Sequence, residues 1–194
     1  MARALPATSL AERRCDDRYQ RLMAATRDAA ARGYDAVSMR DLARSTRLSM
    51  TTIYQFCASK DHLIAEAHLE WMEGAREVME AHPIRGRSPR VRMITYTRRL
   101  TDTWTKRETL MRTLLRAIYS IDPGVAEVRA SLRENNVRIM ELALGSDPVP
   151  HRADVIEILG QVIDSVSLRW VSGTIEAEEA RKVFERTVKV LIPS

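Results

Sequence analysis

Hydroxyl, amide, phenol and guanidinium groups gather between residues 38 and 60 of this 194-residue chain. Such groups form hydrogen bonds with phosphate oxygens and with the edges of bases. The chemistry predicted from this set is therefore recognition of a nucleic acid, provided that the backbone turns the side chains to one face. The candidate DNA-contacting residues are Ser38, Arg40, Ser49, Met50, Thr51, Thr52, Tyr54, Gln55 and Lys60.

Three serines in this segment mark the starts of closely spaced helices. Ser38-Met39-Arg40-Asp41 has the form of a capping box, and Ser49 and Ser59 are further N-caps. The pattern predicts short helices over about 39–45 and 50–57 and a longer helix from residue 60. A helix, a tight turn and a second helix form the unit whose second helix can enter the major groove of DNA. An apolar seam is expected to lock the two short helices together: Leu42, Ala43, Leu48 and Ile53.

The excess of positive charge lies in the same part of the chain. The formal net charge is +5, and residues 1–60 hold 11 basic and 6 acidic residues, which leaves 20 of each elsewhere. A basic end is a candidate surface for a polyanion. Charge alone is equally compatible with a solvated surface of mixed sign.

Composition favours an all-α fold. Gly and Pro are scarce at seven each, and runs with the period-2 alternation of strands are missing. We predict a disordered tail over 1–10, a DNA-binding domain over 11–58 and a larger helical body over 59–194. The nine predicted helices cover about 11–32, 39–45, 50–57, 60–81, 90–105, 107–120, 123–144, 151–172 and 176–192.

Three stretches resemble the DNA-binding region of tetracycline-repressor-type transcriptional regulators: 36–43, 48–56 and 58–63, with Tyr54 and Ser59-Lys60 as their most specific features. The resemblance implies that Arg40 and Gln55 read bases, that Thr52 and Tyr54 contact phosphate or thymine, and that Lys60 holds a phosphate. Phe56 stands where a phosphate-binding His or Tyr is usual. Cys57 stands where Phe usually packs, which leaves volume for a neighbour such as Phe56 to fill.

The resemblance also implies a dimeric body with a cavity for a small apolar effector. Two apolar stripes on the helix over 151–172 favour burial on two sides, and the predicted dimer interface is Ile156, Gly160, Ile163, Ser167, Val171, Val183 and Val190. The predicted cavity lining is Met93, Tyr96, Leu100, Trp104, Met111, Leu115, Ile118, Tyr119, Met140 and Trp170. Leu114–Tyr119 and Leu168–Val171 resemble regulators of steroid breakdown, which implies a steroid or an acyl-CoA as effector. Its polar end would meet one of four cations: Arg92, Arg98, Arg99 or Arg116.

A two-fold dimer predicts a pseudo-palindromic operator of double-stranded DNA, and repression relieved by the effector. Two cysteines without a CxxC motif predict neither a zinc site nor a disulfide framework. We expect no metal and no cofactor. No signal peptide or membrane span is evident, so we expect a cytoplasmic protein. His62 and Glu66 lie one helical turn apart without a third catalytic group, so no enzyme is predicted. The alternative is a helical, dimeric interaction or adaptor protein.

Overall fold

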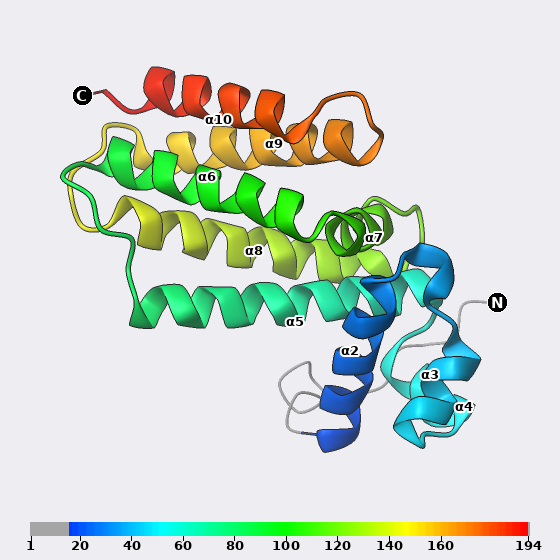
Figure 1. Ribbon diagram of the computed structural model, residues 1–194. Coiled ribbons are helices and arrows are strands. Elements are labelled where there is room, and N and C mark those ends of the chain that lie inside the picture. Colours follow the sequence, from blue (N-terminus) through cyan, green and yellow to red (C-terminus); the bar gives the residue numbers. More distant parts are fainter. Residues whose placement is uncertain (1–15, 194) are drawn as a thin grey trace. The chain divides into compact units, whose positions relative to one another are not determined.

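The computed structural model of the protein describes residues 16–193, and every regular segment among them is helical (Figure 1). Nine α-helices and one 3-10 helix, η1, lie in this part of the chain, as the all-α prediction requires. Their bounds are α2 Asp17–Ala30, η1 Tyr34–Ala36, α3 Met39–Thr46, α4 Met50–Phe56, α5 Lys60–Ala81, α6 Pro89–Lys106, α7 Glu108–Ile118, α8 Val125–Leu144, α9 Arg152–Val171 and α10 Ala177–Leu191.

Local sequence explains where the first helix begins and ends. The Asp16 side chain accepts a hydrogen bond from the amide of Arg18 at 2.8 Å and so caps α2. The chain leaves α2 through Gly33, whose φ of +115° suits a residue without Cβ. The earlier start predicted near residue 11, and the tail predicted over 1–10, lie outside the described residues.

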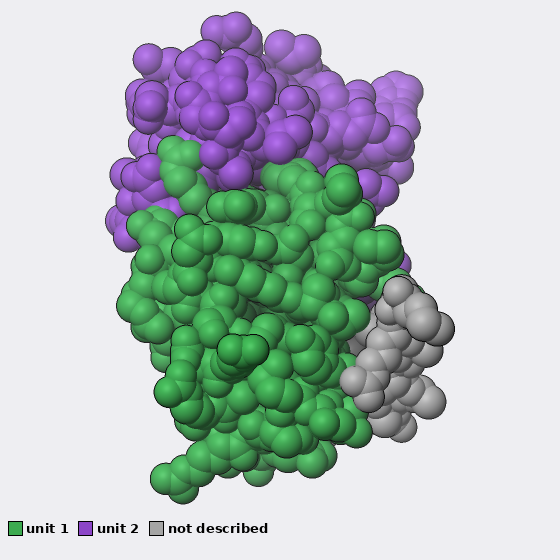
Figure 2. Space-filling model, turned by 90° about the vertical axis from the view of Figure 1, so that its right-hand side faces the viewer, with its two compact units in different colours: residues 1–71, 109–130 green, residues 72–108, 131–194 purple. Residues whose placement is uncertain are grey.

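The chain divides into two compact units, coloured separately in Figure 2. The described part of unit 1 comprises residues 16–71 and 109–130, and that of unit 2 comprises residues 72–108 and 131–193. Helices α5 and α8 each contribute residues to both units. The boundary predicted near residue 58 separates functions. The compact units divide the chain differently, since most of α7 and parts of α5 and α8 belong to the same unit as α2 to α4.

Unit 1 has an apolar core that contains one buried polar network. Tyr19 of α2 donates its hydroxyl hydrogen bond to Glu66 of α5 at 2.8 Å, and His62 lies 3.3 Å from the same carboxylate. All three side chains are buried. Because a buried carboxylate needs hydrogen-bond donors, these contacts give His62 and Glu66 a structural role in anchoring α2 to α5.

Unit 2 is filled by an aromatic cluster. Trp104 of α6 stacks on Trp170 of α9 with ring centroids 4.9 Å apart, and Phe184 of α10 meets Trp104 edge to face at 5.9 Å. Each ring is at most 2% exposed. Offset and edge-to-face pairs of this kind add to the free energy of apolar burial. No helix of the described residues is long and apolar enough to cross a membrane.

Candidate nucleic-acid interface

All three predicted serine caps are present. The Ser49 hydroxyl accepts from the Thr52 amide at 3.0 Å, and the Ser59 hydroxyl accepts from the His62 amide at 3.0 Å. The Ser38 hydroxyl accepts a longer hydrogen bond, 3.4 Å, from the amide of Asp41. These caps fix the first turns of α4, α5 and α3, so the sequence locally dictates where each helix begins.

The turn between α3 and α4 is tight because one residue adopts the left-handed conformation. Arg47 has φ 57° and ψ 37°, and the amide of the next residue, Leu48, donates to the Ala43 carbonyl at 3.0 Å. Leu42 and Ile53 are buried behind the turn, while Ala43 and Leu48 are half-buried. The predicted seam therefore joins the two helices in the structure.

Phe56 and Cys57 both point into unit 1. Phe56 is 7% exposed, and its ring meets Tyr19 in an edge-to-face contact with centroids 5.6 Å apart. Cys57 is fully buried. Phe56 thus takes a packing role in place of the phosphate contact that is usual at its position, and it supplies bulk beside the small Cys57 side chain.

The opposite side of α4 carries predicted DNA-contacting residues, and we call four of them the polar row: Thr51, Thr52, Tyr54 and Gln55. Thr51, Tyr54 and Gln55 are exposed, and Tyr54 keeps 37% of its surface accessible. Met50 and Thr52 are half-buried, and the Thr52 hydroxyl lies 2.8 Å from that of Ser49. Free donors and acceptors on one face of a short helix can reach phosphates and base edges, whereas Ser38 and Ser49 are already engaged as caps.

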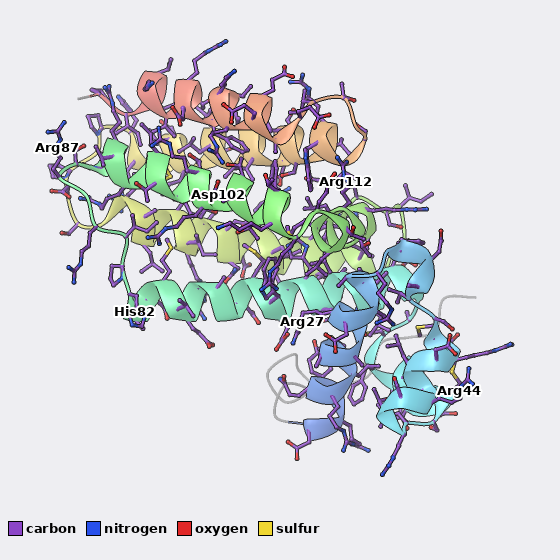
Figure 3. All side chains as sticks on the ribbon, viewed as in Figure 1. Arg27, Arg44, His82, Arg87, Asp102 and Arg112 are labelled. Carbon is purple, nitrogen blue, oxygen red and sulfur yellow. The ribbon has the colours of Figure 1, made fainter. Side chains whose placement is uncertain are left out.

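Helix α3 and the turn that follows it carry three arginines with exposed side chains: Arg40, Arg44 and Arg47. Arg44, labelled in Figure 3, pairs with the Asp41 carboxylate. The guanidinium of Arg40 is free to form the two-pronged hydrogen bond that suits a guanine edge. The surface of α3 and α4 therefore combines positive charge with outward hydrogen-bonding groups.

Lys60 is held in place by an aromatic ring, a feature that the sequence analysis missed. Its Nζ lies 3.9 Å from the centroid of the Tyr34 ring, and the guanidinium carbon of Arg116 lies 3.9 Å from the same centroid. Burial lowers the pKa of Lys60 from its usual value. The ring orients a cation at the first turn of α5, where the helix dipole also attracts phosphate.

The Tyr34 hydroxyl connects this cluster to the loop after α7. It donates to the Asp61 carboxylate, which also accepts from the Ser120 hydroxyl at 2.6 Å. Burial, followed by the hydrogen bond to Asp61, raises the pKa of Tyr34 to about 12. In the sequence, the only signal for this contact is that a tyrosine directly follows Gly33. That position alone does not identify the partners of Tyr34.

The ten residues predicted to line an effector cavity are mostly buried. Met111, Leu115, Ile118 and Tyr119 belong to unit 1, and the other six belong to unit 2. Only Leu100 and Tyr119 are half-buried; the rest are at most 8% exposed. Two surface hollows, one lined by residues 145–150 and 152 and the other by one face of α10, contain none of the ten. The cavity remains a prediction.

Three of the four cations predicted to meet the polar end of an effector have other partners. Arg92 donates to the Ala143 carbonyl at 3.2 Å and also binds the Leu144 carbonyl. Arg98 donates to Glu185 at 2.7 Å, and Arg116 stacks on Tyr34. Arg99 is exposed.

Much of the predicted dimer stripe is buried inside the single chain, and the stripe remains a prediction. Ile156, Ile163 and Ser167 are buried within unit 2, and a Cβ on Gly160 would meet the Met140 side chain at 3.7 Å. Val171 and Val183 are half-buried, while Val190 is 76% exposed. The apolar side chains that α9 leaves accessible are Ile158 and Leu168, 43% and 49% exposed.

Together, the all-α fold and the helix-turn-helix with its outward polar row define a DNA-binding transcriptional regulator. Residues 22–67 match the family model of the tetR family of bacterial regulatory proteins, and residues 86–191 match the model of the tetracyclin repressor-like C-terminal domain. The chain belongs to the TetR family.

Individual relatives agree with this assignment. The chain is 25% identical over 178 residues to the HTH-type transcriptional repressor KstR of Rhodococcus jostii (strain RHA1), a match that covers 91% of this chain and 83% of the relative. A TetR transcriptional regulator from Rhodococcus sp. RHA1 has a similar fold, with a TM-score of 0.78, 17% identity and coverage of 94% and 98% of the two chains. FadR from Bacillus subtilis, solved in complex with stearoyl-CoA, has a TM-score of 0.59, 12% identity and coverage of 90% and 98%.

Proposed function

We propose that this regulator is a homodimeric repressor that binds a pseudo-palindromic operator and leaves it when a small apolar effector binds. The observation that carries the proposal is the arrangement of α3 and α4. Serine caps and an apolar seam fix these helices, while Thr51, Tyr54 and Gln55 stay exposed. Within this arrangement Arg40 and Gln55 read bases, and Thr52 and Tyr54 contact the backbone or a thymine methyl group. Lys60 holds a phosphate.

The dimer in this proposal forms through α9 and α10. Ile158 and Leu168 are large apolar side chains left exposed on α9, and Val190 is left exposed on α10. Covering such side chains with a second copy of the same helices removes apolar surface from water. A two-fold axis through this contact would present two helix-turn-helix units to two half-sites.

The effector in this proposal is a steroid or an acyl-CoA bound among the predicted cavity residues. The support is their composition, which is rich in Met and aromatic side chains that adapt to apolar ligands. The fold shared with FadR, which was solved with stearoyl-CoA, is a second reason to test acyl-CoA. An effector acts only if it binds one conformation of the dimer better than the other.

Helix α5 is the element through which such a change would reach DNA. Its first turn carries both Lys60 and Asp61, and Asp61 accepts the hydrogen bond from Ser120 in the loop after α7. A movement of that loop would therefore move the phosphate-binding end of α5. The contact gives the proposed coupling a specific physical path within unit 1.

The experiment that tests the proposal selects genomic DNA fragments that the purified full-length protein retains at physiological salt. We expect the retained fragments to share an inverted repeat, and we expect affinity to fall steeply with salt because Lys and Arg displace counterions from phosphates. Absence of enrichment by folded protein would overturn operator binding and favour the adaptor alternative. Sedimentation showing only monomer at micromolar concentration would overturn the dimer.

A further inference from the structure

His68 is a buried histidine on α5 to which the sequence analysis gave no role. Its side chain belongs to unit 1 and is 6% exposed. Neither the nucleic-acid interface nor the His62–Glu66 network uses it. A buried imidazole normally satisfies both ring nitrogens, so the partners of this one decide what it can do.

One ring nitrogen of His68 lacks a hydrogen-bond partner among the described residues. This atom is Nδ1, and it is buried. The backbone carbonyl of Leu114 on α7 lies close to the ring and raises the pKa of His68, as a hydrogen-bond acceptor does. We place the proton on Nε2, toward the Leu114 carbonyl, so that Nδ1 carries an unused lone pair.

The imidazole is neutral at physiological pH. Burial lowers the pKa of His68 to about 4, although the Leu114 carbonyl acts in the opposite direction. A neutral ring with its proton on Nε2 is a hydrogen-bond acceptor at Nδ1. An unused buried acceptor costs free energy, since it has lost its hydrogen bonds to water without replacement.

The surroundings of this acceptor are apolar and overlap the predicted effector site. The Trp71 ring lies tilted beside the imidazole, with centroids 6.3 Å apart. Leu114 is fully buried, and its neighbours on α7 include Met111, Leu115 and Ile118, three of the predicted lining residues. The His68 ring thus lies against the helix that supplies much of that lining in unit 1.

We propose that His68 is the polar recognition group of the effector site, with Nδ1 accepting a hydrogen bond from a hydroxyl or N–H group on an otherwise apolar effector. This inference rests on the proposed function, because it assumes that an apolar effector binds beside α7. A neutral acceptor selects against ketones, ethers and ionised carboxylates, which have no proton to donate. The effector class is therefore an apolar molecule with one buried hydrogen-bond donor.

The first test compares ligands that differ only in the donor. The probes are a hydroxysteroid with its methyl ether and a long-chain alcohol with its methyl ether, titrated against the full-length dimer by calorimetry. We expect at least one alcohol to bind about tenfold or more tightly than its ether, because the ether leaves Nδ1 unpaired. Equal binding of alcohol and ether in both pairs would overturn the role of His68 while leaving an apolar effector site intact.

Two variants separate the two ring nitrogens. Gln in H68Q can reach the Leu114 carbonyl like Nε2 but offers nothing at Nδ1, whereas Asn in H68N places an amide oxygen near Nδ1. We expect H68Q to abolish the preference for the alcohol and H68N to keep part of it. Operator affinity measured without probe shows whether each variant is folded.

Nitrogen NMR of the wild-type protein tests the inference without any variant. We expect a free, unprotonated Nδ1 resonance for His68 that moves to the position of a hydrogen-bonded nitrogen when the alcohol is added. A resonance already at the bonded position in the ligand-free protein would show that a buried water satisfies Nδ1, and would overturn the proposal. If none of the four probes binds while operator binding is intact, both this inference and the proposed effector class fail, and the DNA-binding function stands.

Discussion

Helix α4 turns polar side chains outward from a short, capped segment, whereas α9 turns large apolar side chains inward along twenty residues. On α4, Thr51, Tyr54 and Gln55 are exposed and are not needed for packing. On α9, Trp170 and its neighbours are buried against other helices. A recognition surface can therefore be positioned by helix caps that leave its side chains free, whereas most large side chains of α9 are needed for packing.

Replacing Trp170 by Ala should produce the largest effect, because this side chain of α9 is needed for packing. The ring is 2% exposed and stacks on Trp104, so we expect its loss to lower the free energy of unfolding by about 3–5 kcal/mol. Chemical denaturation followed by circular dichroism measures the change. The control is Val78→Ala at a side chain that is 64% exposed. A loss below about 1 kcal/mol at Trp170 would mean that this ring lines open space rather than fills the core.

Lowering the pH should reduce folding stability because the neutral side chain of His68 is buried. Its pKa is about 4 in the folded chain, against about 6.5 in an unfolded chain. As pH falls from about 6.5 to 4 the unfolded state takes up this proton first, so folding stability should fall, by up to roughly 3 kcal/mol. Denaturation curves of wild type and His68→Gln should diverge in this window and run parallel above it. Parallel curves throughout would show that His68 has an ordinary pKa.

Arg40 should matter for one base pair rather than for DNA in general. We expect Arg40→Ala to weaken operator binding by about 1–3 kcal/mol and to relax preference at a single position. Fluorescence anisotropy with a set of single-base operator variants measures both effects. Arg138→Ala removes the same charge from an exposed site on α8, outside the proposed dimer contact, and serves as control. If Arg40→Ala weakened binding equally on every operator variant, Arg40 would contact a phosphate and not a base.

The exposed apolar side chains of α9 offer a smaller, concentration-dependent effect. We expect Ile158→Asp to weaken the dimer by about tenfold or more, roughly 1.4 kcal/mol, because a carboxylate would be buried at the contact. Sedimentation velocity over a dilution series measures it. Ile121→Asp makes the same change at a side chain that is 99% exposed in unit 1. If both variants dimerise like wild type, the interface lies elsewhere.

The sequence predicted the helices and the outward row well because both depend on local signals. Serine caps, a glycine after α2 and the spacing of Leu42 and Ile53 determine them within a few residues. The sequence does not show which of the two apolar stripes of α9 packs inside the chain, because the two stripes look alike in sequence. Only packing shows that Ile156 and Ile163 are buried within the chain. The roles of Tyr34 and His68 depend on partners from α7 or from the loop that follows it, and no local pattern announces such contacts.

Replacing Tyr34, whose ring contacts Lys60, should change operator affinity by the smallest amount. It tests most directly how the start of α5 is positioned for DNA binding. Tyr34→Leu removes the surface on which Lys60 and Arg116 rest, so we expect operator binding to weaken by about 0.5–1 kcal/mol on all sequences. The salt dependence should keep its slope, because the charge remains, whereas Lys60→Ala should reduce the slope by about 1. Tyr34→Phe keeps the ring and removes only the hydroxyl that donates to Asp61. Tyr34→Phe could weaken DNA binding as much as Tyr34→Leu does. That result would mean that the hydrogen bond to Asp61, which also binds Ser120, positions the start of α5, and that the ring itself has no separate effect.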